Sequence, residues 1–268
     1  MQKMTGLDLS FAVAELAQLQ GKRIAKIRRT ANGIFLFKIG SEELLFETGV
    51  RLHLTRQVLA ATERPDGFVG FLRKNFEGKT AARIFQVPNE RIVEIETKSK
   101  ERLVFELFRK GNLIAVGEDG VIAACLEQEE TGGRKIARGE RYSYPKAGNF
   151  EIKKPADVAF AVQENEKGEP VSFSCDAKKD GRGFASFSEM ADYYYANRKE
   201  ESDAERAAKE KLKKLHERLE SQKKALEELV QKRQEAKEAG DAIYSNFEKV
   251  ENVLAEARKA KKDVELEL

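Results

Sequence analysis

The chain of 268 residues has few of the side chains from which most enzyme active sites are built. It contains two cysteines and two histidines. Cys125 and Cys175 are isolated from each other and from any histidine at metal-ligand spacing, so neither a metal site nor a disulfide is expected. His53 and His216 have no Ser or Cys nucleophile signature nearby, which leaves a catalytic triad without support. The sequence therefore predicts a protein that is not an enzyme and that needs no metal and no cofactor.

Long apolar runs and phosphate-binding loops are also missing. No segment approaches the roughly 20 apolar residues that a membrane span needs, and no apolar signal core follows the first methionine. Neither G-x-x-x-x-G-K-[ST] nor G-x-G-x-x-G occurs, so no nucleotide phosphate cradle is predicted. Charged residues make up 35% of the chain, but 49 basic and 46 acidic residues nearly cancel. We expect a cytoplasmic protein without a membrane partner, and the net charge of +3 does not by itself indicate nucleic acid.

The pattern of apolar residues and glycines changes near residue 185 and divides the chain into two parts. Before it, short apolar runs alternate with Gly, Asn and charged residues, which is typical of strands and tight turns. After it, Gly is nearly absent and apolar residues follow a heptad rhythm. We predict a folded domain over residues 1–145, a polar linker or shortened intervening segment over 146–184, and a helical arm over 185–268.

The N-terminal part is predicted to be an α+β domain. Apolar spacing indicates a helix over residues 9–19, which ends at Gly21, and a second helix over 67–76. Turn pairs such as Asn32-Gly33 favour antiparallel meanders over βαβ units. The result is a β-sandwich or flattened barrel with flanking helices. The predicted strands are 23–29, 34–38, 43–47, 51–55, 82–87, 91–97, 103–108, 113–116 and 121–126.

The remaining segments are less regular. The basic, Gly-containing stretch 131–141 is predicted to be a mobile loop. The arm is predicted to consist of one helix, a break at Gly240 and a second helix. Its apolar stripe needs a partner, which is the arm itself, a second copy or a larger particle. The leucines of the stripe are Leu212, Leu215, Leu219, Leu226 and Leu229.

Two charged sites stand out because they lie at the starts of predicted elements. Asp8 falls at or just before the first helix, where a carboxylate complements free backbone N–H groups, so helix capping is an open alternative to a binding role. Glu90 and Arg91 open a predicted strand. Basic pairs at 73–74 and 109–110, with the 134–141 stretch, would form a phosphate-binding surface if they converged. The composition alone favours the alternative that they are scattered solubilising charges.

Six motifs in order over residues 4–114 resemble the N-terminal domain of the NFACT family, in an archaeal-like version. This family includes the bacterial RqcH and FbpA proteins and the eukaryotic nuclear export mediator factor. The segment 187–195 before the arm and the segment 240–247 within it resemble the family as well. The six motifs are Thr5-Gly6-Leu7-Asp8-Leu9, Gly21-Lys22-Arg23-Ile24, Arg51-Leu52-His53-Leu54-Thr55, Phe71-Leu72-Arg73-Lys74-Asn75-Phe76-Glu77-Gly78, Glu90-Arg91-Ile92-Val93 and Arg109-Lys110-Gly111-Asn112-Leu113-Ile114.

The resemblance implies a role in ribosome-associated quality control. Such proteins bind a large ribosomal subunit that carries peptidyl-tRNA, recruit tRNA and support C-terminal tailing of the stalled chain. It also implies tRNA contacts at Asp8, Glu90 and Arg91. The basic clusters, apart from the resemblance, make Arg73, Lys74, Arg109 and Lys110 candidates for nucleic-acid backbone contacts. The resemblance further implies a fold similar to the N-terminal domain of formamidopyrimidine-DNA glycosylase, but Met1-Gln2 does not match that enzyme's Pro-Glu start.

Three departures from the family pattern stand out. Glu90 replaces an Asp, Asn75 replaces a His, and no helix-hairpin-helix pair is found between Pro145 and Phe184. The alternatives are a protein–protein scaffold or fibronectin-binding-like adhesin, and, less well supported, a glycosylase-like DNA-binding protein. The quality-control interpretation predicts that Asp8 and Glu90-Arg91 lie on one face of the domain although they are far apart in the sequence.

Overall fold

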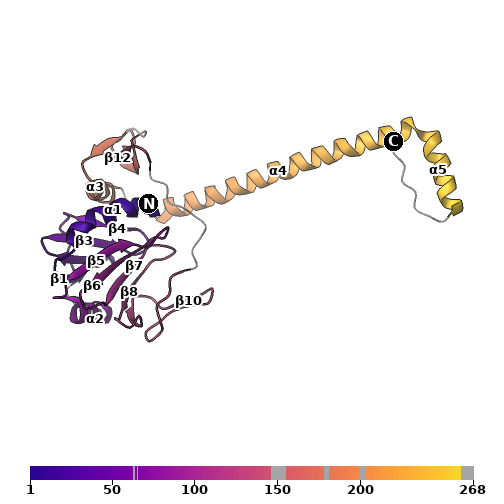
Figure 1. The fold of residues 1–268 in the computed structure, drawn as a ribbon. Coiled ribbons are helices and arrows are strands. Elements are labelled where there is room, and N and C mark those ends of the chain that lie inside the picture. The colour runs from indigo at the N-terminus through magenta and orange to yellow at the C-terminus, as the bar shows by residue number, and fades with distance from the viewer. Residues whose placement is uncertain (63, 65, 146–154, 178–180, 199–202, 261–268) are drawn as a thin grey trace. The chain divides into compact units, whose positions relative to one another are not determined.

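A computed structural model describes residues 1–62, 64, 66–145, 155–177, 181–198 and 203–260. Its contacts divide the chain into two compact units, Met1–Lys199 and Glu200–Leu268. The first unit holds the sheets and the second holds the long helices (Figure 1). We describe each unit by itself.

Two antiparallel sheets form the body of the first unit, as the sequence predicts. Each is a meander in which sequence neighbours pair, because tight turns with a Gly, Asn89 or Lys100 in a left-handed conformation return the chain directly. The four-stranded sheet contains β1 (Ile24–Arg29), β2 (Phe35–Ile39), β3 (Glu42–Glu47) and β4 (Arg51–Thr55). The five-stranded sheet contains β5 (Ala81–Gln86), β6 (Ile92–Thr97), β7 (Arg102–Glu106), β8 (Asn112–Val116) and β9 (Ile122–Cys125).

The two sheets meet through aromatic side chains. Phe105 on β7 makes edge-to-face contacts with Phe37 and Phe46 of the other sheet, at ring separations of 5.4 and 5.1 Å. All three rings are fully buried. Burial of one such ring contributes about 1.5–3 kcal/mol, and the edge-to-face geometry adds to it. A bridge between Arg23 and Thr80 also links the sheets along one edge.

Two helices flank the sheets (Figure 1). Helix α1 (Gly6–Leu16) continues as a short 3-10 turn, η1 (Ala17–Leu19), and α2 (Gly67–Phe76) is capped by Asp66. The α2 prediction is confirmed. The first helix starts three residues earlier than predicted, because Thr5 rather than Asp8 is its N-cap. The N-terminal end of α1 lies beside Gln86, and Gly21, just after η1, lies beside Ala81, so α1 and η1 together run along the edge strand β5.

The stretch predicted as a mobile loop is a β-hairpin instead. Strands β10 (Glu129–Thr131) and β11 (Arg134–Ile136) pair across Gly132 and Gly133, which both have positive φ. Ile136 and Tyr142 pack against the outer face of β6–β9 and form a second small core with Ile92 and Ile114. The two glycines read as a loop in the sequence, but they provide the left-handed residues that a hairpin turn needs.

The segment predicted as a polar linker contains a third small sheet. Strands β12 (Val158–Glu164), β13 (Pro170–Asp176) and β14 (Arg182–Phe184) pair in the order β13-β12-β14. Val162 and Phe173 belong to the main core of the first unit. The linker prediction is therefore wrong for 158–176 and 182–184, and its residues 146–154 and 178–180 lie outside the described residues.

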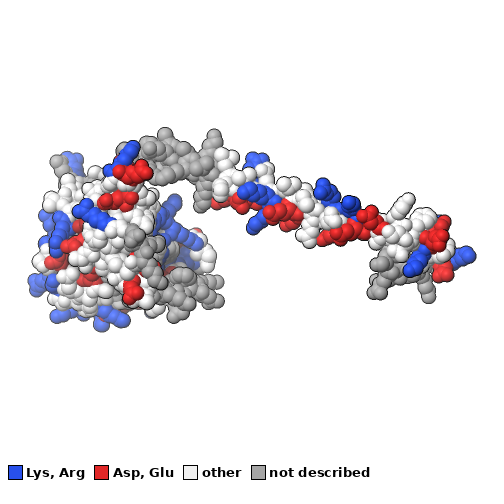
Figure 2. Space-filling view, turned by 90° about the horizontal axis from the view of Figure 1, so that it is seen from above, with Lys and Arg blue, Asp and Glu red and all other residues white. Residues whose placement is uncertain are grey.

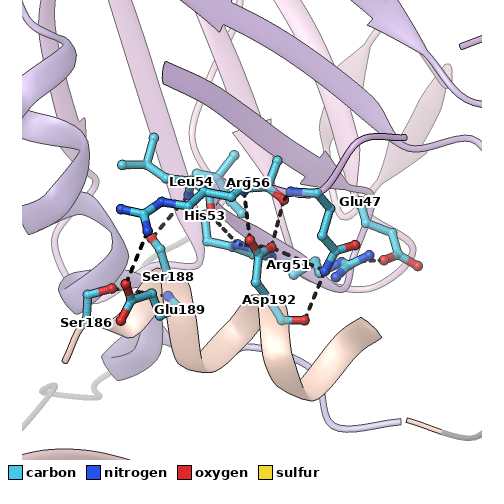
Figure 3. A network of polar contacts seen from close by, with 12 residues as sticks. Glu47, Arg51, His53, Leu54, Arg56, Ser186, Ser188, Glu189 and Asp192 are labelled. Atoms are coloured by element: carbon cyan, nitrogen blue, oxygen red, sulfur yellow. Dashed lines mark hydrogen bonds and ion pairs between the residues drawn. The ribbon is translucent and has the colours of Figure 1, made fainter. Parts of the chain in front are cut away.

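Helix α3 (Phe187–Asn197) covers the exposed edge of β4, as Figure 3 shows. The Asp192 carboxylate accepts hydrogen bonds from the Thr55 hydroxyl (2.7 Å) and the Arg56 backbone N–H (2.8 Å). The Ser188 hydroxyl accepts one from the Leu54 backbone N–H at 3.2 Å. These side chains occupy the donors that a free edge strand would offer to another chain.

The second unit consists of α4 (Asp203–Ser245) and α5 (Phe247–Ala260). The predicted break at Gly240 is wrong, since α4 runs through this residue. A single glycine costs a helix only about 1 kcal/mol. The helices separate at Asn246, whose side-chain amide donates to the carbonyl of Ala242 (2.9 Å) and so competes with the backbone pattern. None of the described helices is both long and apolar enough to cross a membrane.

An exposed apolar stripe follows α4, and its charges are sorted around it. Figure 2 shows basic and acidic side chains on different sides of the helix. From residue 215 onward, helical spacing places most basic residues beside the stripe and the acidic ones on the opposite side. The stripe contains Leu215, Leu219, Leu226, Leu229 and Val230, and the residues beside it are His216, Arg218, Lys223, Lys232 and Lys237.

Burial of His53 predicts a loss of stability in acid. His53 is fully buried in β4, and its Nδ1–H donates to the carbonyl of Leu54. Burial and the nearby Arg51 charge, offset in part by this hydrogen bond, lower the pKa of His53 from 6.5 to about 3. The unfolded chain therefore binds an extra proton in this window. The free energy of unfolding from this group falls as pH drops from 6.5 toward 3.

His53→Asn keeps a side-chain donor but removes the titration. We expect urea unfolding to show a smaller stability loss between pH 7 and pH 4 in this variant than in the parent. Burial raises the pKa of Asp192, which acts in the opposite sense but is common to both proteins. His216→Asn, at an exposed site on α4, should behave like the parent. Equal losses in His53→Asn and the parent would contradict the prediction.

Candidate nucleic-acid interface

Asp8 has a structural role at the start of α1. It occupies the third helical position, where its carboxylate accepts from the Thr5 backbone N–H (2.7 Å) and the Thr5 hydroxyl (2.8 Å). The Asp8 backbone N–H donates in return to the Thr5 hydroxyl at 3.2 Å. This reciprocal pair is a capping box. The capping alternative is therefore correct in kind, although Asp8 lies inside the first turn and not before it.

The second oxygen of Asp8 faces a different element. The Cys175 thiol on β13 donates to Asp8 Oδ1 at 3.5 Å. Burial raises the pKa of Cys175, and the charge and hydrogen bond of Asp8 raise it further, so the residue stays a thiol. Asp8 is only 6% exposed. Capping box and thiol together fix the direction of the carboxylate.

Arg91 lies directly before β6, which starts one residue later than predicted, and the Arg91 carbonyl accepts from the Leu107 N–H at 2.8 Å. Burial lowers the pKa of Arg91, while the charges of Asp8 and Tyr195 act to raise it. The structure thus brings Asp8 and Arg91 within electrostatic reach of each other. Among the described residues, no hydrogen-bond partner is found for the buried Nε and Nη2 atoms of Arg91.

Among the described residues, no hydrogen bond or ion pair joins the Glu90 carboxylate to the Arg91 guanidinium. The surroundings of Glu90 belong to the hairpin side of the domain: burial raises the pKa of Glu90, the Arg134 charge lowers it and the Glu106 charge raises it. Glu90 therefore lies between the Asp8–Arg91 pair and the β10–β11 hairpin. The two predicted sites, Asp8 and Glu90-Arg91, are adjacent.

Two neighbouring pockets open at this end of the sheets, and Phe108 lines both. The first, about 360 Å³, is lined by Lys3, Met4, Thr5, Gly6, Asn89, Glu90, Arg91 and Phe108. The second, about 470 Å³, lies against the hairpin, and its lining includes Arg109, Gly132, Gly133, Arg134 and Tyr144. We call the surface formed by the two pockets the loop-end surface.

The turns around the loop-end surface are tightly constrained. Asn89 and Arg109 both adopt positive φ, 60° and 54°, which is uncommon for residues with side chains. A Cβ on Gly111 would lie 2.0 Å from the backbone nitrogen of Gly49, so two turns pack backbone against backbone. The Met4 N–H donates to Val50 O at 2.9 Å and ties the N-terminal segment to the same place.

The two buried carboxylates beside the hairpin, Glu94 and Glu106, have hydrogen-bond partners. Glu106 accepts from Arg134 and from the Tyr142 hydroxyl (2.9 Å). Burial acts to lower the pKa of Arg134, but the hydrogen bond and charge of Glu106 raise it. Glu94 accepts from Arg102 (3.0 Å) and from Tyr144 (2.6 Å), and burial with this bond raises the pKa of Tyr144 to about 12. Arg134 is thus occupied by a buried ion pair.

The predicted basic clusters do not all converge. Arg109 and Lys110 are exposed beside the loop-end surface, where Arg109 pairs with Glu129 at 2.7 Å. Arg73 and Lys74 lie on α2, which packs on β1 and β9. Pocket-lining contacts place the end of α2 near residues 116–119, at the opposite end of β8 from the loop-end surface. Arg73 Nε donates to the carbonyl of Ile27 (2.8 Å), which is a structural contact.

Sequence reasoning missed several residues of this surface. Phe108 and Tyr144 line pockets, but the sequence shows them only as an apolar strand end and a residue before a proline. Asn89 follows Pro88, a turn signal that could have indicated a left-handed residue. Within the described residues, no cluster of three or more His, Cys, Asp or Glu side chains could hold a metal ion.

Comparison with known proteins identifies the family of the chain. A sequence profile described as "NFACT N-terminal and middle domains" matches residues 5–166, more than half of the chain. The chain is 29% identical over 147 residues to the "Ribosome quality control complex subunit NEMF homolog" of Drosophila melanogaster, covering 52% of this chain and 15% of that protein. It is 30% identical over 159 residues to the "Archaeal Rqc2 homolog aRqcH" of Methanocaldococcus jannaschii, covering 53% and 23%.

Solved structures show the same fold. The N-terminal part of a fibronectin/fibrinogen-binding protein from Streptococcus suis superimposes with a TM-score of 0.60 at 18% identity, over 72% of this chain and 99% of that one. A fibrinogen-binding protein from Staphylococcus aureus gives 0.58 at 20% identity, over 71% and 98%. This protein belongs to the NFACT family. The chain spans less than a quarter of the length of the two curated relatives described above.

The geometry predicts that Asp8 does more than cap a helix. Asp8→Ala removes the capping box and also the carboxylate that balances the half-buried Arg91. We expect it to lower the free energy of unfolding by about 1–3 kcal/mol in urea titrations. Ser186→Ala, which removes the N-cap of α3 without removing a charge, should cost about 1 kcal/mol. A loss in Asp8→Ala no larger than in Ser186→Ala would reduce Asp8 to a cap.

Proposed function

We propose that this chain is the tRNA-binding module of a ribosome-associated quality-control factor. It engages tRNA on a large ribosomal subunit that holds peptidyl-tRNA, and it supports tailing of the stalled chain. The family membership and the curated relatives, which are named as quality-control proteins, support the process. The residues of the loop-end surface support tRNA as the ligand.

The proposal rests mainly on the unpaired hydrogen-bond donors of Arg91. Its Nε and Nη2 atoms are buried and lack a hydrogen-bond partner among the described residues. Leaving such donors unpaired costs free energy, so the site is poised for a ligand that supplies acceptor oxygens. A guanidinium presents its donors as a planar fork that matches two phosphate oxygens. A nucleic-acid backbone provides such groups.

The surroundings of Arg91 fit a nucleic acid better than an isolated anion. Lys3, Arg109 and Lys110 border the same end of the domain, and phosphates along a backbone would meet several of them. The exposed aromatic side chain of Tyr144, with Phe108 between the pockets, offers apolar surface for bases. Peptide-bond formation in tailing belongs to the ribosome, so the proposed role is positioning of tRNA and not catalysis.

A scaffold or adhesin role is the alternative, and one observation favours it. The apolar stripe of α4 is exposed and could contact a protein partner. Pairing of this arm as a coiled coil, with a second copy or with another helix, is a separate proposal that rests on the same stripe. A glycosylase-like role gains no support from the loop-end surface. The scaffold role predicts protein partners and no bound RNA.

The test of the main proposal is RNA binding by the purified chain, together with co-sedimentation with large ribosomal subunits. A narrow set of tRNAs should be enriched. RNA crosslinked to the protein in cells, once sequenced, should contain the same tRNAs. Protein partners without any RNA in these experiments would favour the scaffold role.

Salt dependence should separate the two ends of the domain. Lys110 and Lys74 are both exposed, but only Lys110 borders the loop-end surface. Loss of one phosphate contact lowers the slope of log affinity against log salt by about 1. In filter-binding titrations we expect Lys110→Ala to flatten the slope and Lys74→Ala to leave it unchanged. The reverse pattern would move the interface to α2.

Arg91→Lys tests the fork geometry itself. Lysine keeps the positive charge opposite Asp8 but lacks the planar donor array. We expect the variant to melt within a few degrees of the parent, and to bind tRNA about tenfold or more weakly, more than the loss of one surface charge would cause. Lys74→Arg serves as a matched exchange outside the surface. Parent-like affinity in Arg91→Lys would leave Arg91 an ordinary half-buried residue.

A further inference from the structure

We propose that Gln86 is the positioning residue that joins the two halves of the Asp8–Arg91 site. Its side-chain amide bridges the first turn of α1 and the turn that carries Arg91. The proposal rests on the proposed function for its binding measurement, but the bridge itself can be tested separately. Gln86 belongs to none of the motifs that carry the family resemblance.

Gln86 is the last residue of β5, at the edge of the five-stranded sheet and next to α1. Its Nε2 atom donates to the carbonyl of Gly6 at 2.9 Å and to the carbonyl of Glu90 at 2.8 Å. Gly6 begins α1, two residues before Asp8, and Glu90 directly precedes Arg91. One amide group therefore connects the backbones of both charged sites.

The bridge requires a donor of this length. The amide nitrogen of glutamine carries two hydrogens, and here each has its own acceptor. Glutamate has the same shape but only acceptor oxygens, which would face two carbonyl oxygens. Methionine has a similar length but cannot donate. Gln86 is half-buried, so water does not fully replace the lost bonds.

The turn that carries Arg91 needs such an anchor. Its base is closed by bonds from Val87 N–H to Ile92 O (2.9 Å) and from Glu90 N–H to Val87 O (3.1 Å). Within the turn, Asn89 adopts a left-handed conformation, which costs free energy and needs support from its surroundings. Gln86 holds the Glu90 carbonyl from the α1 side.

The distance between Asp8 and Arg91 depends on this anchor. Their attraction is electrostatic, and it weakens as the charges separate. A shift of the turn by about 1 Å would also redirect the unpaired Nε and Nη2 donors of Arg91, and a ligand contact of this kind tolerates little misplacement. Gln86 thus acts on the ligand through Arg91 and not by touching it.

Gln86→Met should weaken tRNA binding about tenfold, because both hydrogen bonds of the bridge are lost and the turn that carries Arg91 can shift. Gln86→Glu should weaken it at least as much. The matched control is Gln18→Met, because the exposed Gln18 amide also donates to a backbone carbonyl, that of Glu15 at 3.0 Å. Gln18→Met should bind like the parent. Parent-like binding by Gln86→Met overturns the proposal.

A double-mutant cycle separates positioning from general stability. If Gln86 acts through Arg91, Gln86→Met should cost less than about twofold in an Arg91→Lys background, where the fork is already absent. A merely structural loss would multiply with the Arg91→Lys effect. Fully additive free-energy losses therefore overturn the positioning role, even if both single variants bind weakly.

Hydrogen exchange tests the bridge without tRNA. We expect the backbone amides of residues 6–9 and 89–91 to exchange faster together in Gln86→Met than in the parent. Unchanged exchange in both segments overturns the bridge. If the parent binds no tRNA at all, the proposed function fails, and hydrogen exchange alone decides whether Gln86 couples the two segments.

Discussion

The packing of Phe105 against Phe37 and Phe46 fixes how the two large sheets of the first unit lie against each other. These rings set the two sheets face to face, so the ends of their strands meet at common edges. The turn at Gly49 then comes against the turn at Gly111, close enough that neither could carry a side chain. The segments that hold Asp8 and Arg91 meet at the same end, although about eighty residues separate them. A surface assembled from loops thus owes its geometry to an aromatic core.

The buried carboxylates beside this surface differ from Arg91 in how completely they are hydrogen-bonded. Glu94 and Glu106 are almost completely shielded from water, yet each accepts from an arginine and a tyrosine. Such complete pairing is what burial of charge normally requires. Arg91 has the Asp8 charge within reach, but two of its donors have no acceptor among the described residues. Arg28, Arg29 and Arg51 each also keep one buried donor without a partner among the described residues, but Arg91 keeps two, at the place where the proposed ligand would bind.

Local signals predicted most strands and α2, because apolar alternation and Gly-containing turns act over a few residues. They failed where one local sequence is compatible with two different structures. Thr5 and Asp8 are both good caps, and only the backbone shows which one precedes the helix. The glycines at 132–133 fit a loop or a hairpin equally, and the polar residues of 158–176 hide an alternation whose inner side chains include Phe173 and Cys175. The site came from the family resemblance, which pairs Asp8 with Arg91, whereas Phe108, Asn89 and Gln86 gain their roles from contacts that no local pattern contains.

The sorted charges of α4 constrain which helix could share its apolar stripe. If two copies of the arm paired along this stripe, in either direction, residues such as Arg218, Lys223 and Lys232 would face basic residues of the other copy across the seam. Like charges at these flanking positions repel, and salt would relieve the repulsion by screening. A helix whose stripe is bordered by acidic residues would meet the same flanks with attraction, which salt would weaken. The charges beside the stripe therefore disfavour pairing with a second copy of the arm, whereas its leucines alone would pack against any apolar helix.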